Sequence, residues 1–314
     1  MYNFLFCFDS NYNTQALVSI NSLLNKVSQP VNIYIIHDDR KTILQSIKLI
    51  ESNKNLNTIH IYQFNDIVTP LPEIKTHISK ATYFRLFISK YLPKDIDYIL
   101  YLDSDIICIK DPIKELKLIK EKMILENSVI AARIETERDR NPKLFERLKL
   151  KNNLHFNAGV LLINFQKWEK ENVSTKIFKI LKNRFEEIFD YDQELLNVYF
   201  DGDFVAMPKS LNFQATGAQS KKNLNTLKSN IYFYHYLGKD KPWEIKNINK
   251  PSTYIYQDEF HKLFKEDFHF VLKKNKEELK TILKLTLSFF TFKNKKLYSI
   301  LKFSFKKLLR NRIR

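Results

Sequence analysis

The sequence predicts an α/β fold in which helices pack against a β-sheet whose first strands run parallel. Three observations support this class. Strand-like and helix-like segments alternate over residues 1–62, 44% of the 314 residues are hydrophobic, and only 4 Gly and 9 Pro interrupt the pattern. Alternation at this spacing is typical of βαβ units. The apolar content is high enough to bury a core, which excludes disordered and collagen-like chains.

The first 62 residues contain three expected strands, at 1–8, 31–36 and 58–62, separated by expected helices at 14–26 and 41–51. Both helices repeat apolar residues at helical spacing. Sheets of this kind bind ligands beyond the carboxyl ends of their strands, where Asp9 and Asn11 follow the first strand. No GxGxxG motif follows that strand, so the dinucleotide-binding fingerprint is absent.

The later elements follow from the same patterns. We expect a helix at 80–91, apolar strands on both sides of a polar break at 103–105, a buried strand at 155–164, helices at 168–189 and 193–200, and a strand at 231–236. Residues 133–153 are polar, charged and weakly periodic, which predicts a surface segment or lid. Residues 215–228 are expected to form a polar loop.

The two cysteines, Cys7 and Cys108, are too few for a disulfide scaffold or a Cys-based zinc module. Both lie in apolar runs and are expected to be buried, reduced thiols, which fits a cytoplasmic protein. No window holds the roughly 18 consecutive apolar residues of a membrane span. The N-terminus also lacks the basic start of a signal peptide. A cytoplasmic location is therefore the expectation.

Positive charge is concentrated at the C-terminus. The chain carries +17 in total, and residues 271–314 hold eleven Lys and three Arg against two Glu, which leaves only +5 for the first 270 residues. Leu297, Leu301, Phe305 and Leu308 recur at helical spacing among these cations. A basic amphipathic helix is typical of a segment that binds an anionic membrane surface. The alternatives are a solvated, partly disordered tail and a nucleic-acid-binding tail, although the body lacks a nucleic-acid motif.

Asp103 and Asp105 interrupt an apolar run, and an unpaired carboxylate is costly to bury in such a run. Residues i and i+2 of a strand point to the same side, so the two carboxylates could share one divalent ion. Hard oxygen ligands suit Mg²⁺ or Mn²⁺. The alternative is a turn with solvated acids. His235 ends the strand at 231–236 and is either a further metal ligand or a structural histidine.

Four motifs, in order, resemble those of glycosyltransferase family 8. They are YLDSD at 101–105, FNAGVLLIN at 156–164, DQELLN at 192–197 and HYLGKDKPW at 235–243. Asp9, Asn11 and Arg85 add to the likeness, which spans about residues 1–245. It is strongest to bacterial lipooligosaccharide α-1,4-galactosyltransferases and related lipopolysaccharide glycosyltransferases.

The resemblance implies a GT-A fold, with a Rossmann-like mixed sheet flanked by helices. It implies a catalytic domain at 1–250, divided into a nucleotide-sugar half at about 1–110 and an acceptor half at about 111–250. A basic helical, membrane-associating region would follow at 251–314. The implied reaction moves a hexose, galactose or glucose, from a UDP-sugar to a hydroxyl with retention of the anomeric configuration. The implied cofactor is Mn²⁺, with Mg²⁺ as the other candidate.

The resemblance also implies roles for particular residues. Asp103, Asp105 and His235 are the expected metal ligands. The expected donor contacts are Asp9, Asn11, Arg85, Ser104, Asn157, Ala158, Asp192, Gly238 and Lys241. Asp192 and Gln193 would lie beside the anomeric carbon as catalytic residues. A neutral amide is a poor nucleophile, so Gln193 favours front-face attack over double displacement, without deciding between them.

The expected acceptor is a lipid-linked oligosaccharide of a lipopolysaccharide or lipooligosaccharide core, met at the cytoplasmic face of the inner membrane. No nucleic-acid partner is expected. Residues 133–153 and 215–225 match the family weakly, which leaves acceptor recognition open. Two other functions also stay open: a glycogenin-like, protein-primed glucosyltransferase, and a catalytically weak sugar-nucleotide-binding protein of the same fold.

Overall fold

The computed structural model describes residues 1–65, 71, 79–215, 228–248, 250–271 and 282. The chain forms two compact units, which are described separately below. The first comprises Met1–Gln214 and Leu227–His235, and the second comprises Ala215–Thr226 and Tyr236–Arg314. The domain boundaries expected from the sequence stay a prediction.

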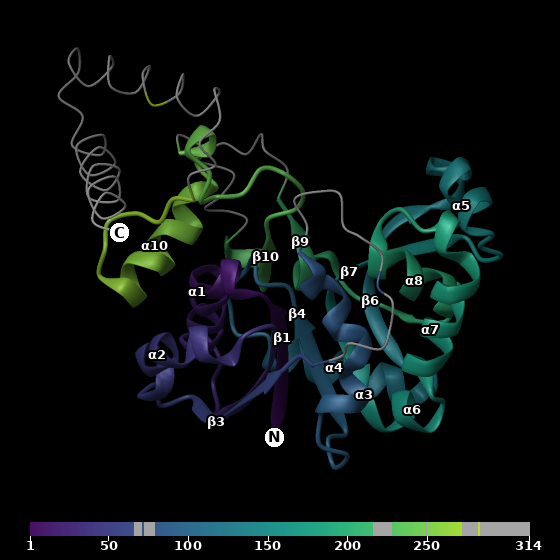
Figure 1. Cartoon of the computed structure of the whole chain (residues 1–314), viewed down its shortest axis with the longest axis horizontal. Helices are drawn as coiled ribbons and strands as arrows, with labels where there is room; N and C mark the ends of the chain where they lie inside the picture. Colours follow the sequence, from purple (N-terminus) through teal and green to yellow (C-terminus); the bar gives the residue numbers. More distant parts are fainter. Residues whose placement is uncertain (66–70, 72–78, 216–227, 249, 272–281, 283–314) are drawn as a thin grey trace. The chain divides into compact units, whose positions relative to one another are not determined.

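A mixed β-sheet forms the centre of the first unit (Figure 1). Among the described residues it has seven strands, in the order β3-β2-β1-β4-β7-β6-β8. Strands β1 to β4 run parallel, whereas β7 is antiparallel to both β4 and β6. The strands are β1 (Tyr2–Phe8), β2 (Val31–His37), β3 (Leu56–Gln63), β4 (Tyr98–Leu102), β6 (Ile130–Glu137), β7 (Leu154–Asn164) and β8 (Val205–Ala206). The α/β class predicted from the sequence is confirmed.

Helices of the first unit connect these strands. They are α1 (Asn13–Leu24), α2 (Arg40–Glu51), α3 (Ile88–Tyr91), α4 (Ile113–Leu125), α5 (Pro142–Leu148), α6 (Phe165–Lys170), α7 (Val173–Arg184) and α8 (Tyr191–Phe200). Side-chain caps mark some of their starts: Asp39 accepts a hydrogen bond from the backbone N–H of Lys41 at α2, and Asn164 accepts one from Lys167 at α6. Such caps satisfy backbone donors that the first helical turn leaves unpaired.

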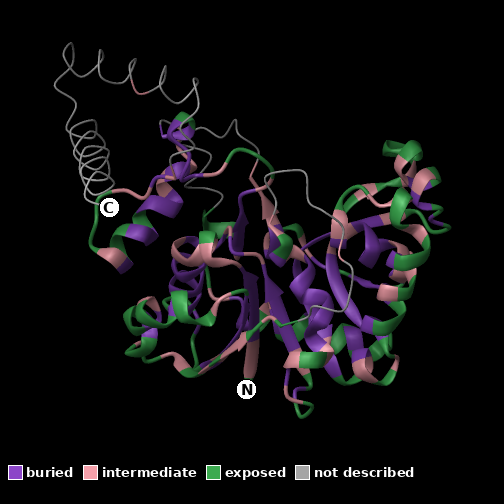
Figure 2. Cartoon of the chain, viewed as in Figure 1, coloured by how far each residue is buried: buried purple, intermediate pink, exposed green. Residues whose placement is uncertain are grey.

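One face of the sheet packs against the later helices. Alternation along β1 and β4 places Leu5, Cys7 and Tyr101 in the same buried cluster as Trp168 of α6. The 3₁₀ helix Lys80–Phe87 and helices α7 and α8 contribute further buried residues to this cluster. Figure 2 shows the central strands as mostly buried. This core fixes the strand ends that carry the polar site residues.

A second, smaller sheet of the first unit contains β5 (Ile106–Cys108), β9 (Phe213–Gln214) and β10 (Phe233–His235). Among the described residues its order is β5-β10-β9, with β10 antiparallel to β5. The register pairs His235 with Ile106, the residue after Asp105. Strand pairing therefore brings the histidine to the acids from a distance of more than a hundred residues along the chain.

The second unit has its own small core. Ile245, Ile248 and Phe270 are buried together, and helix α10 (Thr253–Phe264) supplies Tyr256, whose ring meets Trp243 edge-on with centroids 5.1 Å apart. Within the residues that the structure describes, no helix is both long enough and apolar enough to cross a membrane. Most of the basic tail expected to bind membranes lies outside the described residues.

Three expectations about local structure need correction. Residues 133–153 are not simply a surface segment, because β6 covers Ile130–Glu137 and α5 covers Pro142–Leu148. The buried part of β6 ends at Ala132. The more exposed part that follows carries charged residues, and these led to the prediction of a surface segment instead of a strand. The helix expected at 168–189 is two helices, α6 and α7, separated where Asn172 adopts a left-handed conformation with φ of 55°. The helix expected at 80–91 is mainly a 3₁₀ helix.

Candidate metal and donor site

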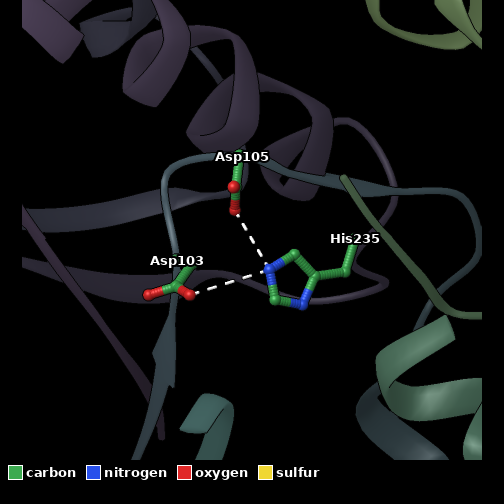
Figure 3. A group of neighbouring side chains, drawn as sticks. All are labelled: Asp103, Asp105 and His235. Carbon is green, nitrogen blue, oxygen red and sulfur yellow. Dashed lines mark ion pairs between the residues drawn. The ribbon is translucent and has the colours of Figure 1, made fainter. Parts of the chain in front are cut away.

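Asp103, Asp105 and His235 form one cluster at the carboxyl end of β4 (Figure 3). The candidate ligand atoms of the three residues all lie within 4.8 Å of one another. His235 Nε2 lies 3.2 Å from Asp105 Oδ1 and 3.7 Å from Asp103 Oδ2. The imidazole is buried, whereas the acids keep part of their surface exposed. The structure thus brings together the three residues expected as metal ligands.

The donor set and its surroundings fit a divalent cation. Two carboxylates are oxygen ligands that suit Mn²⁺ and Mg²⁺, and the imidazole is a nitrogen ligand that favours a transition-metal ion such as Mn²⁺. Gly159 of β7 leaves the space that the cluster occupies, since a Cβ there would lie 2.8 Å from Asp103 Oδ2 and overlap His235 Cε1. The backbone N–H of Asp103 donates to the Gly159 carbonyl at 2.9 Å, which holds the strands at this separation. The glycine is therefore a steric requirement of the cluster.

Arg85 is a buried cation beside this cluster. Its Nη2 lies 3.2 Å from Asp103 Oδ1, its Nε lies 2.8 Å from Asp192 Oδ2, and its Nη1 donates to the Ala158 carbonyl at 2.6 Å. The guanidinium also stacks over the Tyr101 ring, 4.2 Å from its centroid. Burial alone would lower the pKa of Arg85, but Asp103 and Asp192 raise it on balance. The side chain stays charged and joins two carboxylates.

Asp192, in the first turn of α8, faces Arg85 from within the core. It is 3% exposed, and burial raises its pKa to about 6, against the opposing effects of Arg85 and of a hydrogen bond from the Thr82 hydroxyl. The preceding residue, Tyr191, has φ of 47°. A left-handed conformation is costly for a side chain of this size, by about 1–3 kcal/mol. The strained residue thus directly precedes Asp192, whose side chain is buried in the core.

The amide of Gln193 is held at both ends. Its Oε1 accepts from the backbone N–H of Ala158 at 3.0 Å and from Asn157 Nδ2 at 3.2 Å. Its Nε2 donates to Glu135 Oε2 at 3.0 Å and to Asp190 Oδ2 at 3.1 Å. The orientation of this amide is therefore fixed by donors on one side and acceptors on the other.

Asn157 and Ala158, expected as donor contacts, lie on β7 and are both buried. Asn157 Oδ1 accepts from the backbone N–H of Gly159 at 3.1 Å and from Asn212 Nδ2 at 2.8 Å. Asn212 Oδ1 in turn lies 2.9 Å from His235 Nδ1. A contact between Asn157 and a donor sugar stays a prediction.

A cavity of about 460 Å³ opens at the carboxyl ends of β1 and β2. Asp9, Asp38, Phe64 and Phe84 line part of it, and the two phenyl rings stack with centroids 3.9 Å apart. Asp9 also accepts hydrogen bonds from the Asn11 N–H and the Ser79 hydroxyl. A cavity of about 600 Å³ lies at the amino ends of the strands instead, where parallel sheets do not usually bind ligands.

The remaining expected donor contacts are placed as follows. Asn11 is exposed in the 3₁₀ turn after β1, and Ser104 is buried between the two acids. The Ser104 hydroxyl has no hydrogen-bond partner among the described residues. Gly238, with φ of 64°, and Lys241, whose Nζ donates to the Tyr236 carbonyl at 2.6 Å, belong to the second unit. Their role in donor binding stays a prediction.

Several residues of the site were missed from the sequence. Glu135, Asp190 and Asn212 lie outside the four motifs. Two more were missed although each bonds to an expected site residue. The Tyr101 hydroxyl donates to Asp103 Oδ1 at 2.5 Å, and the Thr82 hydroxyl accepts from Arg85 Nη2 at 3.2 Å. Alternation along β4 places Tyr101 on the side of Asp103, and helical spacing places Thr82 near Arg85, so these two could have been found. Asp190 lies three residues before Gln193, whose Nε2 donates to it, so helical spacing could have found it as well. Glu135 and Asn212 join the site only through the fold.

Comparison with known proteins places the chain in a family. A family model described as Glycosyl transferase family 8 matches residues 3–247. The chain is 31% identical over 264 residues to a lipopolysaccharide 1,2-glucosyltransferase of Escherichia coli strain K12, covering 79% of this chain and 74% of that enzyme. It is 33% identical over 183 residues to a lipopolysaccharide 1,3-galactosyltransferase of Salmonella typhimurium strain LT2, covering 56% and 53%. The latter match spans about half of that relative.

Among solved structures, the chain resembles the galactosyltransferase LgtC in complex with donor and acceptor sugar analogs. The TM-score is 0.69 at 21% identity, over 88% of this chain and 99% of LgtC, which shows a common fold. The mixed sheet, its flanking helices and this likeness show the GT-A fold. The chain belongs to glycosyltransferase family 8, as its motifs predict.

Proposed function

We propose that the chain transfers a hexose, galactose or glucose, from a UDP-sugar to a saccharide hydroxyl of a lipopolysaccharide or lipooligosaccharide core, with retention and with Mn²⁺ as cofactor. The cluster of Asp103, Asp105 and His235, in a chain of this family, is the observation that carries the proposal. Mg²⁺ is the alternative cofactor. The two lipopolysaccharide transferases among its relatives support the acceptor class.

The cavity beside Asp9 suits the nucleoside of the donor. Its phenyl rings offer an apolar wall for a base, and the Asp9 carboxylate can accept hydrogen bonds from a base N–H or a ribose hydroxyl. The diphosphate would then extend along the carboxyl end of the sheet towards the acids. When bound there, a divalent cation neutralises diphosphate charge and stabilises the charge that develops on the leaving group.

The arrangement around Gln193 supports front-face transfer. The carbonyl oxygen of a neutral amide is a poor nucleophile. In Gln193 this oxygen also accepts two hydrogen bonds, which lowers its nucleophilicity further. In front-face transfer, the acceptor oxygen bonds to C1 of the sugar as the bond from C1 to the UDP oxygen breaks. The proton of the acceptor hydroxyl passes to the leaving diphosphate. Gln193 then orients the sugar rather than forming a covalent bond to it.

The test is release of UDP from a panel of UDP-sugars, in Mn²⁺ or in EDTA, by wild type and Asp103→Ala. We expect slow hydrolysis of UDP-galactose or UDP-glucose that requires Mn²⁺ and is lost in the variant. Adding truncated lipopolysaccharide cores should accelerate release and add one hexose to the core, seen by mass spectrometry. Added hexose on the protein itself would indicate a protein-primed enzyme. Metal-dependent UDP binding without turnover would indicate a sugar-nucleotide-binding protein.

A location on the cytoplasmic face of the inner membrane is part of this proposal. The concentration of cations in residues 271–314 supports it, because each basic residue near an anionic surface contributes about 1 kcal/mol to binding. We expect the full chain to sediment with anionic vesicles and less with zwitterionic ones. A variant with the eleven lysines of this segment replaced by glutamine should stay in solution. Equal binding of both proteins to anionic vesicles would refute the membrane role.

A further inference from the structure

A continuous chain of side-chain amides connects His235 with Gln193. It runs from His235 Nδ1 to Asn212, from Asn212 to Asn157, and from Asn157 to Gln193. The first three residues are buried, with Asn212 at 0% exposure and His235 at 2%. We infer that Asn212 is a positioning residue that holds His235 in the tautomer with its proton on Nδ1, so that Nε2 presents a lone pair to the metal site.

The orientation of each amide follows from a backbone donor. The Gly159 N–H can only donate, so the atom of Asn157 that lies 3.1 Å away is its carbonyl oxygen. That oxygen lies 2.8 Å from Asn212, which must therefore present its NH₂ group to it. The other end of Asn212 is then its carbonyl oxygen, 2.9 Å from His235 Nδ1. Since a carbonyl cannot donate, Nδ1 carries the proton.

A second backbone donor fixes the far end of the chain independently. The Ala158 N–H donates to Gln193 Oε1 at 3.0 Å, so the Gln193 NH₂ group faces Glu135 and Asp190. Asn157 Nδ2 donates to the same oxygen, which agrees with the orientation deduced from Gly159. The backbone donors of Gly159 and Ala158 therefore give the same orientation of the Asn157 side-chain amide.

The deduced tautomer matters because of what Nε2 faces. This nitrogen lies 3.2 Å from Asp105 Oδ1 and 3.7 Å from Asp103 Oδ2. Only a bare Nε2 can bind a metal, and in the competing tautomer an Nε2 proton would point at the acids instead. That tautomer would also set a bare Nδ1 against the Asn212 carbonyl, two acceptors in a buried place, which is unfavourable. Metal-binding histidines generally donate their other ring N–H to a fixed acceptor.

The tautomer is measurable directly in the full chain labelled with ¹⁵N-histidine, free of metal, at about pH 8. Correlations between ring protons and nitrogens over two bonds distinguish the two neutral tautomers, and His235→Gln identifies the signals of His235. We expect Nδ1 of His235 to carry a proton in the wild type. Asn212→Leu, which keeps the size and removes the acceptor, should populate the Nε2–H form and weaken Mn²⁺ binding by about 10- to 100-fold.

Two further variants separate the tautomer from general disruption. Asn212→Asp keeps an acceptor towards Nδ1 but loses the donor to Asn157, so it should retain the wild-type tautomer. Asn197→Ala removes another buried amide, which bonds the backbone of Phe156 and Gln193 and, among the residues that the structure describes, has no hydrogen bond to His235 or to Asp103 and Asp105. It should lower stability and leave both the tautomer and Mn²⁺ affinity unchanged.

With no metal bound, a proton on Nε2 facing the acids agrees with the inference as long as Nδ1 is protonated too. A bare Nδ1 on His235 in the wild type would overturn the inference, even if no variant folds. An unchanged tautomer together with unchanged Mn²⁺ affinity in folded Asn212→Leu would overturn it as well. The inference rests on the proposed metal site, but the tautomer is recorded without metal and without substrate. A wild type with the Nδ1–H form that binds no Mn²⁺ would therefore refute the proposed cofactor and leave the role of Asn212 standing.

Discussion

Arg85 Nε lies 2.8 Å from Asp192 Oδ2, and both side chains are almost completely buried, at 7% and 4% exposure. The same guanidinium reaches Asp103, so one cation joins the acid of the metal cluster to the acid that precedes Gln193. A charge buried in this way depends on its partner, because neither is solvated by water. The pair therefore links the stability of the fold to the geometry of the site.

Removing the guanidinium while keeping much of the side-chain volume tests this link. We expect Arg85→Met to lower the free energy of unfolding by about 3–5 kcal/mol, since Asp192 is left buried without its cation. The control is Arg140→Met, because Arg140 and Glu137 form an exposed pair, 3.8 Å apart, whose loss should cost less than about 1 kcal/mol. Urea denaturation of both variants gives the comparison. Equal losses of unfolding free energy in the two variants would show that the buried pair contributes no more to stability than the exposed one.

Asp192 also gives the protein a defined pH dependence. Its pKa in the folded chain is about 6, above the ordinary value of 3.8, so the folded state binds the proton more tightly than the unfolded state does. Its contribution to stability is fully present below about pH 3.8 and is lost as the pH rises through about 6. Compared with the wild type, Asp192→Asn should become relatively more stable over this window. A pH-independent difference, measured in EDTA, would contradict the raised pKa.

Glu194, two residues later, should behave in the opposite way. Burial alone would raise its pKa, but Arg147 and the N–H of Phe189 and Asp190 lower it on balance below 4.5. Its contribution is present above about pH 4.5 and is lost as the pH falls through the lowered pKa. The stability advantage of the wild type over Glu194→Gln should therefore shrink in acid. Denaturation of both proteins between pH 3 and 6 checks this, and an advantage that grows in acid would refute it.

Gly159 provides a steric test of the metal cluster. In Gly159→Ala the new Cβ would overlap His235 and approach Asp103 Oδ2, so the imidazole must move. Since displaced ligands bind a metal poorly, we expect Mn²⁺ affinity to fall by about 10-fold or more. Isothermal titration measures this. The neighbouring change Val160→Ala should lower stability by about 1–2 kcal/mol through lost packing and leave Mn²⁺ affinity unchanged. Wild-type affinity in Gly159→Ala would show that the ring does not bind the ion in this position.

The parts of the fold that were predictable are those with local signals. The first strands and helices follow from apolar periodicity, and Asp103 and Asp105 stand out because they interrupt an apolar run. The break at Asn172 was missed, since helical periodicity continues across a single left-handed residue. Strand β6 was missed because only its first half is buried, so its charged second half suggested a surface segment.

The parts of the site that were not predictable depend on pairing between distant segments. Glu135 meets Gln193 across 58 residues, and Asn212 meets Asn157 across 55. An asparagine or glutamate in a polar segment has no sequence pattern that marks its partner. The tautomer of His235 depends on such a partner, so a motif can name the histidine but cannot state which nitrogen is available.

The most direct test of the central claim is the affinity of the protein for UDP, measured by titration calorimetry with saturating Mn²⁺ and with EDTA. Asp103→Ala and His235→Ala remove ligands of the cluster, and Asp97→Ala, at the other end of β4, is the matched control. We predict that wild type and Asp97→Ala bind UDP about 100-fold more tightly with Mn²⁺ than with EDTA, a coupling of about 2.7 kcal/mol. The two ligand variants should lose this difference. Equal UDP affinity in Mn²⁺ and EDTA, or a difference that survives in both ligand variants, would contradict the assignment of the cluster as the metal site of the donor.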